Sequence, residues 1–225
     1  LGRRLGARIE ADPVSLVSRA WFNPNLDSRN FFVPGVLAML VAVVSIILSS
    51  MAIVREREIG TMEQIMVTPI GRLEFILGKT IPFALIGFID VALITLVAVF
   101  WFEVPLRGNP LTLFLATGLY LLSTLGVGLF ISTVSRTQQQ AMMTAFFFML
   151  PAFMLSGFVY PIANMPETVQ WVTLVNPLRY YLVIIRGVYL KGLGLGVLWP
   201  QLAALAVLGS TLIGLAAARF RKTMA

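Results

Sequence analysis

The sequence has 225 residues, of which 58% are hydrophobic and 12% are charged, and its mean hydropathy is +0.89. This composition leaves too little polar surface for a water-soluble globular domain, so the lipid bilayer must surround most of the chain. The formal net charge is +7, but the basic residues lie mostly between apolar runs, which indicates contact with lipid headgroups and argues against nucleic-acid binding.

The N-terminal segment is polar and basic and contains Pro13 and Pro24, so it cannot span a membrane. We predict that residues 1–30 are the end of an extracytoplasmic segment. The first residue is Leu1 rather than methionine. We therefore expect the sequence to be a fragment whose natural start has been lost.

Five apolar stretches follow, and each can cross a hydrocarbon core of roughly 30 Å at a rise of about 1.5 Å per residue. The predicted spans are residues 31–54, 80–102, 111–134, 141–159 and 195–218. Gly118, Gly126 and Gly128 suit close helix packing in the third span, and Pro151 predicts a kink in the fourth. The sequence thus predicts an all-α integral membrane protein built as a helical bundle.

The stretch before the last span contains several prolines and only a short apolar run that carries Arg179 and Arg186. An arginine near the bilayer centre costs at least about 2.5 kcal/mol on insertion scales, and a run of about 10 to 14 apolar residues favours a segment that does not span. We predict that residues 161–192 form a re-entrant pair of short helices that dips into one leaflet and returns.

Five spans place the two ends of the sequence on opposite faces of the membrane. The basic residues divide almost evenly between the faces, so the orientation depends on the bias of the short loops and on the basic C-terminal tail. Both place residues 55–79, 135–140 and 219–225 in the cytoplasm. The C-terminus is therefore predicted to be cytoplasmic.

A short amphipathic helix is predicted at residues 61–68, between the first two spans. Gly60 interrupts the preceding helix, Thr61 and Gln64 have the spacing of a capping box, and Pro69 ends the element. Three apolar residues share one face of this helix, namely Met62, Ile65 and Met66. Such a face suits either docking into the groove of another protein or lying on lipid, and the pattern alone does not separate the two.

Three motifs together resemble the ABC-2 type transporter permeases. They are the run of residues 56–64 with Thr68-Pro69, Asn23-Pro24-Asn25-Leu26 with Val33-Pro34-Gly35, and Asn176-Pro177-Leu178-Arg179-Tyr180. The sequence most resembles the exporter branch that carries a large extracytoplasmic domain and has six spans with both termini in the cytoplasm. The resemblance implies that the first span and most of the outer domain precede this sequence.

The resemblance also implies partners and a site. In such permeases the helix after the second span is a coupling helix that docks on a separate ATP-binding subunit, which binds ATP and magnesium, so this chain needs no cofactor of its own. The residues expected in or beside that contact are Glu56, Glu58, Gly60, Thr61 and Glu63. Asn176, Pro177 and Arg179 mark the re-entrant segment. A second permease subunit, identical or not, and the lipids of the cytoplasmic (inner) membrane are the other expected partners.

The tripeptide Gly78-Lys79-Thr80 does not form a phosphate-binding loop. That motif requires a glycine separated from the Gly-Lys pair by four residues, and Leu73 occupies the required position. We expect the Lys79 ammonium to reach lipid headgroups instead.

Asp90 is the one acidic residue inside a predicted span. A charge at this depth must face the bundle interior, water or a partner. Two interpretations remain open: a contact with a cationic substrate or a proton site, or a protonated or hydrogen-bonded structural aspartate that fixes helix packing, with Thr95 as a neighbour. The structural interpretation is the simpler one.

These features favour the permease subunit of an ATP-driven exporter that moves an apolar or amphiphilic molecule, either drug-like or a lipid or glycan. The alternative is a non-transporting membrane scaffold or sensor that uses the same ATPase contact. The sequence contains no cysteine and no histidine. With Asp90 as the only spanning acid, this disfavours an intramembrane enzyme and a metal site.

Overall fold

The computed structural model describes residues 28–69 and 71–219, and this part of the chain contains helices and no β-strand. Most of the predicted extracytoplasmic segment, residues 1–30, lies outside the described residues. The helices are α1 (Ser28–Ser50), α2 (Val54–Ile59), α3 (Thr61–Val67), α4 (Arg72–Phe100), α5 (Pro110–Val134), α6 (Gln138–Met154), α7 (Glu167–Thr173), α8 (Pro177–Arg186) and α9 (Leu195–Arg219). A 3-10 turn, Ile162–Asn164, precedes α7, and a π turn, Gly187–Lys191, follows α8.

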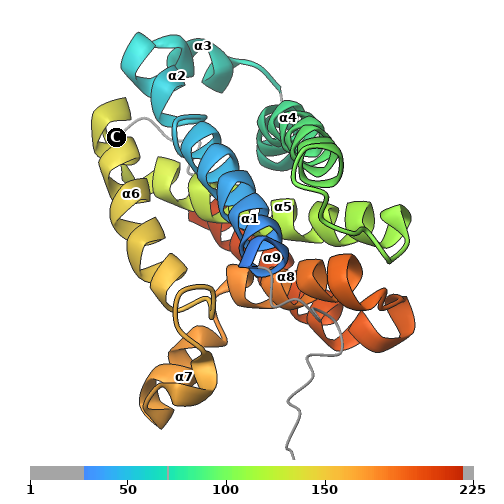
Figure 1. Cartoon of the computed structure of the whole chain (residues 1–225). Helices are drawn as coiled ribbons and strands as arrows, with labels where there is room; N and C mark the ends of the chain where they lie inside the picture. Colours follow the sequence, from blue (N-terminus) through green and yellow to red (C-terminus); the bar gives the residue numbers. More distant parts are fainter. Residues whose placement is uncertain (1–27, 70, 220–225) are drawn as a thin grey trace, which may run out of the picture.

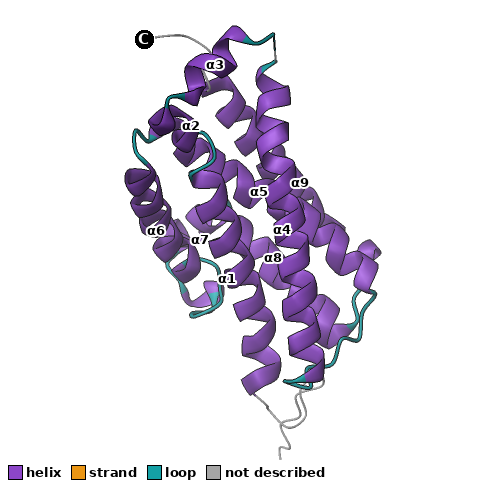
Figure 2. Cartoon of the chain, turned by 90° about the horizontal axis from the view of Figure 1, so that it is seen from above, coloured by secondary structure: helices purple, strands orange, loops and turns teal. Residues whose placement is uncertain are grey.

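Helix α5 forms the centre of the bundle and packs against α1, α4, α6, α8 and α9. In Figure 1, α1 lies in front of α5 and α9, whereas α6 and α7 lie to one side. Figure 2 shows α1 and α4 running side by side, with α2 and α3 at one end of the bundle. The all-α membrane bundle predicted from the sequence is confirmed.

The close approach of α1 and α9 to α5 depends on glycine. A Cβ atom at Gly128 would lie 1.9 Å from the hydroxyl oxygen of Ser49 in α1, and one at Gly126 would lie 2.9 Å from the Cβ of Leu212 in α9. Any larger residue at these positions would push the neighbouring helix away. The predicted packing role of the α5 glycines is confirmed.

Four of the described helices are long and apolar enough to cross a membrane, namely α1, α4, α5 and α9. The predicted span 141–159 corresponds to α6, which ends at Met154 after 17 residues. At about 1.5 Å per residue this helix is shorter than the hydrocarbon core. It is followed by a turn in which Gly157 adopts a φ of +83°, so the fourth predicted span is a shorter helix than the sequence predicts.

Helix α4 also differs from its prediction, because it begins at Arg72 rather than at residue 80. Charged side chains limit the part of a helix that fits into hydrocarbon, but they do not end the helix itself. The first two turns of α4 therefore extend the predicted span toward α2 and α3, which positions the site described below.

Between α6 and α9 the chain forms the two short helices that the sequence predicts for residues 161–192. Helix α8 is buried against α1, α5 and α9, and its Tyr181 ring stacks on Tyr120 of α5 at 4.0 Å between centroids. The hydroxyl groups of Tyr181 and Thr117 are hydrogen-bonded at 2.8 Å. The entry of α7 and α8 into one leaflet of the membrane, and their return from it, stays a prediction.

Candidate functional site

The chain changes direction between α1 and α2, and a side chain of α5 satisfies the backbone at this break. The hydroxyl oxygen of Ser132 accepts hydrogen bonds from the amides of Ile53 at 2.9 Å and Val54 at 3.0 Å. The first amides of a helix have no partner within it, and Ser132 is fully buried. This contact therefore fixes where α2 begins relative to α5.

Three consecutive charged residues of α2 contact four different helices or helix ends. Glu56 accepts hydrogen bonds from Lys79 in α4 and from the Thr61 hydroxyl in α3. Arg57 donates to the carbonyl oxygen of Ser135, directly after α5, at 3.1 Å. Glu58 contacts the first residue of α6, as described below. We call these contacts, together with those of Ser132, the α2 network.

Glu58 caps the beginning of α6. One of its carboxylate oxygens accepts from the Gln138 amide nitrogen at 3.2 Å and from the Gln138 side-chain nitrogen at 2.7 Å. A carboxylate is favoured at a helix N-terminus, where unpaired amides and the helix dipole present positive charge. The motif places Glu58 among the site residues, but it does not identify this partner, which lies 80 positions away.

Glu56 and Lys79 form an ion pair whose side chains are 19% and 33% exposed, respectively. The bond from Lys79, followed by that from Thr61, holds the pKa of the Glu56 carboxyl below its usual value. The Lys79 ammonium group thus has a partner within the chain, and its contact with lipid headgroups stays a prediction. This pair joins α2 to the extended first turns of α4.

Gly60 separates α2 from α3 as predicted. Its φ is +88°, and a Cβ atom there would meet nothing within 4 Å, so the left-handed backbone alone calls for glycine. The Thr61 hydroxyl donates to the carbonyl oxygen of Glu56 at 3.2 Å as well as to its carboxylate. It therefore serves the end of α2 rather than the capping box predicted with Gln64.

The surface that α3 presents also differs from the prediction. Met62 is 9% exposed and packs inward against a small core that includes Ile53, Ile76 and Leu129. Glu63, on the next position, is exposed, and Val67 is 86% exposed. The side chains of Ile65 and Met66 lie outside the described residues. Met62 thus anchors α3 to the bundle, while Glu63 and Val67 are available to a partner.

Asp90 lies in the middle of α4, far from α2. Its Oδ2 atom is buried and has no hydrogen-bond partner in the described part of the chain. Thr95, the neighbour considered above, instead accepts a hydrogen bond from the Tyr189 hydroxyl at 2.9 Å. The structure therefore does not join Asp90 to the other candidate residues.

The third group of candidate residues shapes the beginning of α8. The Asn176 side chain accepts from the Leu178 amide at 3.1 Å and donates to the Ala152 carbonyl oxygen at 2.6 Å, and Pro177 occupies the first helical position. Arg179 donates to the Thr173 hydroxyl at the end of α7. These contacts hold the turn between α7 and α8, which Figure 1 shows at the opposite end of the molecule from α3.

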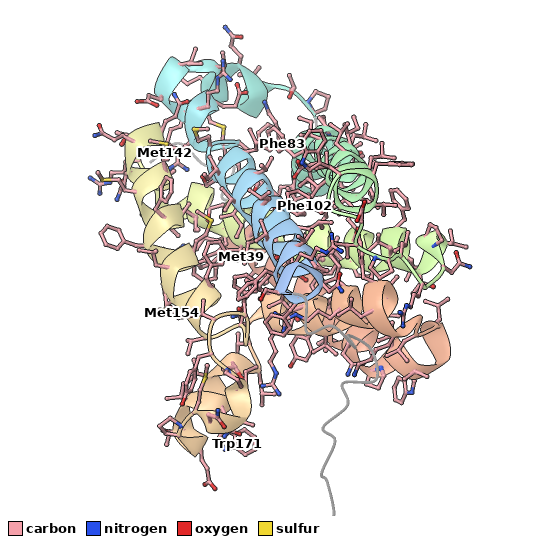
Figure 3. The ribbon with its side chains drawn as sticks, viewed as in Figure 1. Met39, Phe83, Phe102, Met142, Met154 and Trp171 are labelled. Atoms are coloured by element: carbon pink, nitrogen blue, oxygen red, sulfur yellow. The ribbon has the colours of Figure 1, made fainter. Side chains whose placement is uncertain are left out.

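Helix α6 carries a continuous exposed apolar surface. Its exposed members are Met142, Met143, Phe146, Phe147, Phe148, Leu150 and Met154, whereas Met149 is buried. Figure 3 shows Met142 and Met154 near the two ends of this helix. No group of acidic side chains in the described ranges is arranged to hold a metal ion.

The comparisons with known proteins agree with this architecture. The sequence profile described as ABC-2 type transporter matches residues 14–190. The chain belongs to the ABC-2 type transporter family.

Among the relatives of this ABC-2 chain, the probable multidrug ABC transporter permease YbhS of Escherichia coli is 42% identical over 80% of the chain and 48% of the relative. YbhR, which carries the same description, is 36% identical over 92% of the chain and 56% of the relative. A more distant relative, ABC transporter G family member 20 of Dictyostelium discoideum, is 25% identical over 84% of the chain and 26% of the relative. The ABC-2 chain spans about half the length of the bacterial relatives.

Proposed function

We propose that this chain forms part of the permease subunit of an ATP-binding cassette exporter in the cytoplasmic membrane, and that α3 contacts a separate ATP-binding subunit. The α2 network carries the proposal, because it connects α3 to three other helices of the bundle through specific polar contacts. The permease names of the E. coli relatives support it. ATP and magnesium then bind to the separate subunit, and this chain performs no catalysis.

The network suggests how force passes into the membrane. A partner that displaces α3 also displaces α2, since Gly60 is the one residue between them. Lys79, Ser135 and Gln138 then transmit the displacement to α4, to the end of α5 and to the start of α6. A coordinated shift of these helices opens a path for an apolar or amphiphilic molecule. The word multidrug in the relatives' names favours a drug-like substrate over a lipid or glycan.

This function also sets the orientation and the assembly. The end of the bundle that holds α2, α3 and the end of α9 faces the cytoplasm, where ATP is available, and the α7–α8 turn faces outward. A second permease subunit completes the pathway, and its packing competes with lipid for the exposed apolar surface of α6.

The test reconstitutes the full-length protein with its ATP-binding subunit in proteoliposomes. It measures ATP hydrolysis and the export of a fluorescent lipophilic cation. Gly60→Pro alters the left-handed link, and Glu63→Arg reverses a charge on the exposed surface of α3. Both variants should hydrolyse ATP but lose export. Glu167→Arg is the matched control, because Glu167 is an exposed acid on α7 at the other end of the molecule.

Normal export by both variants, or the absence of crosslinks from position 67 to the ATP-binding subunit, would remove α3 from the coupling role. A wild-type complex that hydrolyses ATP but exports none of several lipophilic cations would instead support the non-transporting scaffold.

A further inference from the structure

Arg186 ends α8 at the opposite end of the bundle from α2, and aromatic rings enclose its guanidinium group. The Cζ atom lies 3.9 Å from the ring centroid of Phe31 in the first turn of α1 and 5.8 Å from that of Phe158, after α6. Both separations are within the range of cation–π attraction. Three segments distant in the sequence therefore meet around this one cation.

A glycine in α1 leaves the space that one of these aromatic rings occupies. A Cβ atom at Gly35 would lie 2.2 Å from the Phe158 ring, so only glycine lets this ring lie against α1. The Phe32 ring meets the Phe158 ring edge-on at 5.8 Å between centroids. The position of Phe158 beside Arg186 is thus fixed by packing from two sides.

Two nitrogen atoms of Arg186, Nε and Nη2, are buried and have no hydrogen-bond partner in residues 28–69 and 71–219. An unpaired polar group in an apolar site is costly, and a cationic one more so. The acid Glu103, which lies at this end of the bundle, pairs with Arg29 at 3.3 Å. Among the residues that the structure describes, these two buried N–H groups of Arg186 therefore have no acceptor.

The two unpaired atoms lie on the same edge of the guanidinium group. The Nε–H bond and one Nη2–H bond point in the same direction, and together they match the two oxygen atoms of a carboxylate or phosphate. The Phe31 ring lies close to the group and supplies no acceptor for this edge, whose two nitrogen atoms are buried. Phe31 is 42% exposed, which makes it the part of the enclosure that can move aside.

We propose that this edge of Arg186 binds an oxyanion, a phosphate or carboxylate, carried by an amphiphile at the outer end of the bundle. The aromatic rings contact the apolar part of the amphiphile while the arginine holds its acid group. A phospholipid headgroup and an anionic single-chain substrate offer the same chemistry. Binding at this site does not depend on ATP coupling through α3.

The experiment measures binding to the full-length protein in a neutral maltoside detergent, without ATP or the ATP-binding subunit, by native mass spectrometry. Four probes are compared: dodecyl phosphate, dodecyltrimethylammonium, phosphatidylglycerol and inorganic phosphate. Dodecyl phosphate or phosphatidylglycerol should bind at least about tenfold more tightly than dodecyltrimethylammonium. Preference for the single-chain probe identifies a substrate-like ligand, whereas preference for the two-chain probe identifies a lipid.

Arg186→Gln should weaken binding of the preferred anionic probe about tenfold or more, and Arg186→Lys should recover only part of it, because lysine keeps the charge but lacks the two-atom edge. Arg29→Gln is the matched control, since Arg29 already pairs with Glu103, and it should bind as the wild type does. Equal binding of dodecyl phosphate and dodecyltrimethylammonium by the wild type would overturn the proposal, whether or not the variants fold. Wild-type affinity of Arg186→Gln, or binding of inorganic phosphate alone, would also overturn it.

Discussion

The two ends of the bundle differ in whether their charged side chains have hydrogen-bond partners. Around α2, the side chains of Glu56, Arg57 and Glu58 all have partners on other elements. In the middle of the bundle and at its other end, Asp90 and Arg186 each keep buried polar atoms without a partner in the part of the chain that the structure describes. A satisfied network suits a permanent connection between helices, whereas an unsatisfied group suits a ligand that binds and leaves.

The largest expected effect concerns the packing beneath the α2 network. Gly128→Val places side-chain atoms where the Cβ position is already 1.9 Å from the Ser49 oxygen and 2.7 Å from the Ile46 carbonyl oxygen. The end of α1 must then move away from α5, which we expect to lower stability by about 3 kcal/mol or more. Thermal unfolding in detergent measures the change. Gly214→Ala in α9 is the control, because a Cβ atom there meets nothing within 4 Å, and an equal loss in both variants would contradict the packing argument.

The second prediction removes one acceptor from the network. Ser132→Ala leaves the buried amides of Ile53 and Val54 without their hydrogen-bond acceptor. We expect a loss of about 1–2 kcal/mol, the size of one or two hydrogen bonds between membrane helices. The same unfolding assay applies, with Ser210→Ala as the control, since Ser210 is an exposed residue of α9. A Ser132→Ala protein as stable as the wild type would show that the start of α2 does not depend on α5.

The third prediction tests the ion pair between α2 and α4. Glu56→Lys and Lys79→Glu should each lower stability by about 1 kcal/mol, and the double exchange should recover most of the loss because the opposite charges meet again. Strictly additive losses in the double variant would exclude a direct interaction.

The same pair predicts a pH dependence. Lys79 lowers the pKa of Glu56 below the ordinary value of 4.5, so the stabilisation is fully present above pH 4.5 and is lost as the pH falls through the lower folded-state pKa. The difference in unfolding temperature between the wild type and Glu56→Gln should stay constant from pH 7 to pH 5 and shrink in more acidic buffer.

The same contrast explains how much of the molecule the sequence predicts. Gly60 and the bounds of α5 were predicted correctly, because a left-handed residue and a long apolar run between polar flanks are local features. The beginning of α4 is not predicted correctly. The charges at Arg72 and Lys79 limit contact with hydrocarbon, but they do not end a helix. Periodicity places Met62 on an apolar face but does not show that Met62 packs inward against the bundle.

The partners of the site residues were also beyond the sequence. Ser132 and Gln138 are ordinary polar residues about 80 positions from Ile53 and Glu58. No pattern within a single sequence joins such positions, so only the packing of α1 and α6 against α5 shows the contact. The unpaired edge of Arg186 is a property of its surroundings in the same way.

The smallest expected effect is at Asp90, where the two interpretations of an unpaired group differ most clearly. Asp90→Asn has the same shape but cannot ionise. If Asp90 is a structural residue, stability should change by less than about 0.5 kcal/mol, and export in the proteoliposome assay should stay near the wild-type level. Asp90→Leu, which removes both polar atoms, serves as the comparison for packing. A severe loss of export in Asp90→Asn with unchanged unfolding would instead identify a cation or proton site, and both unpaired groups would then be binding groups of opposite charge.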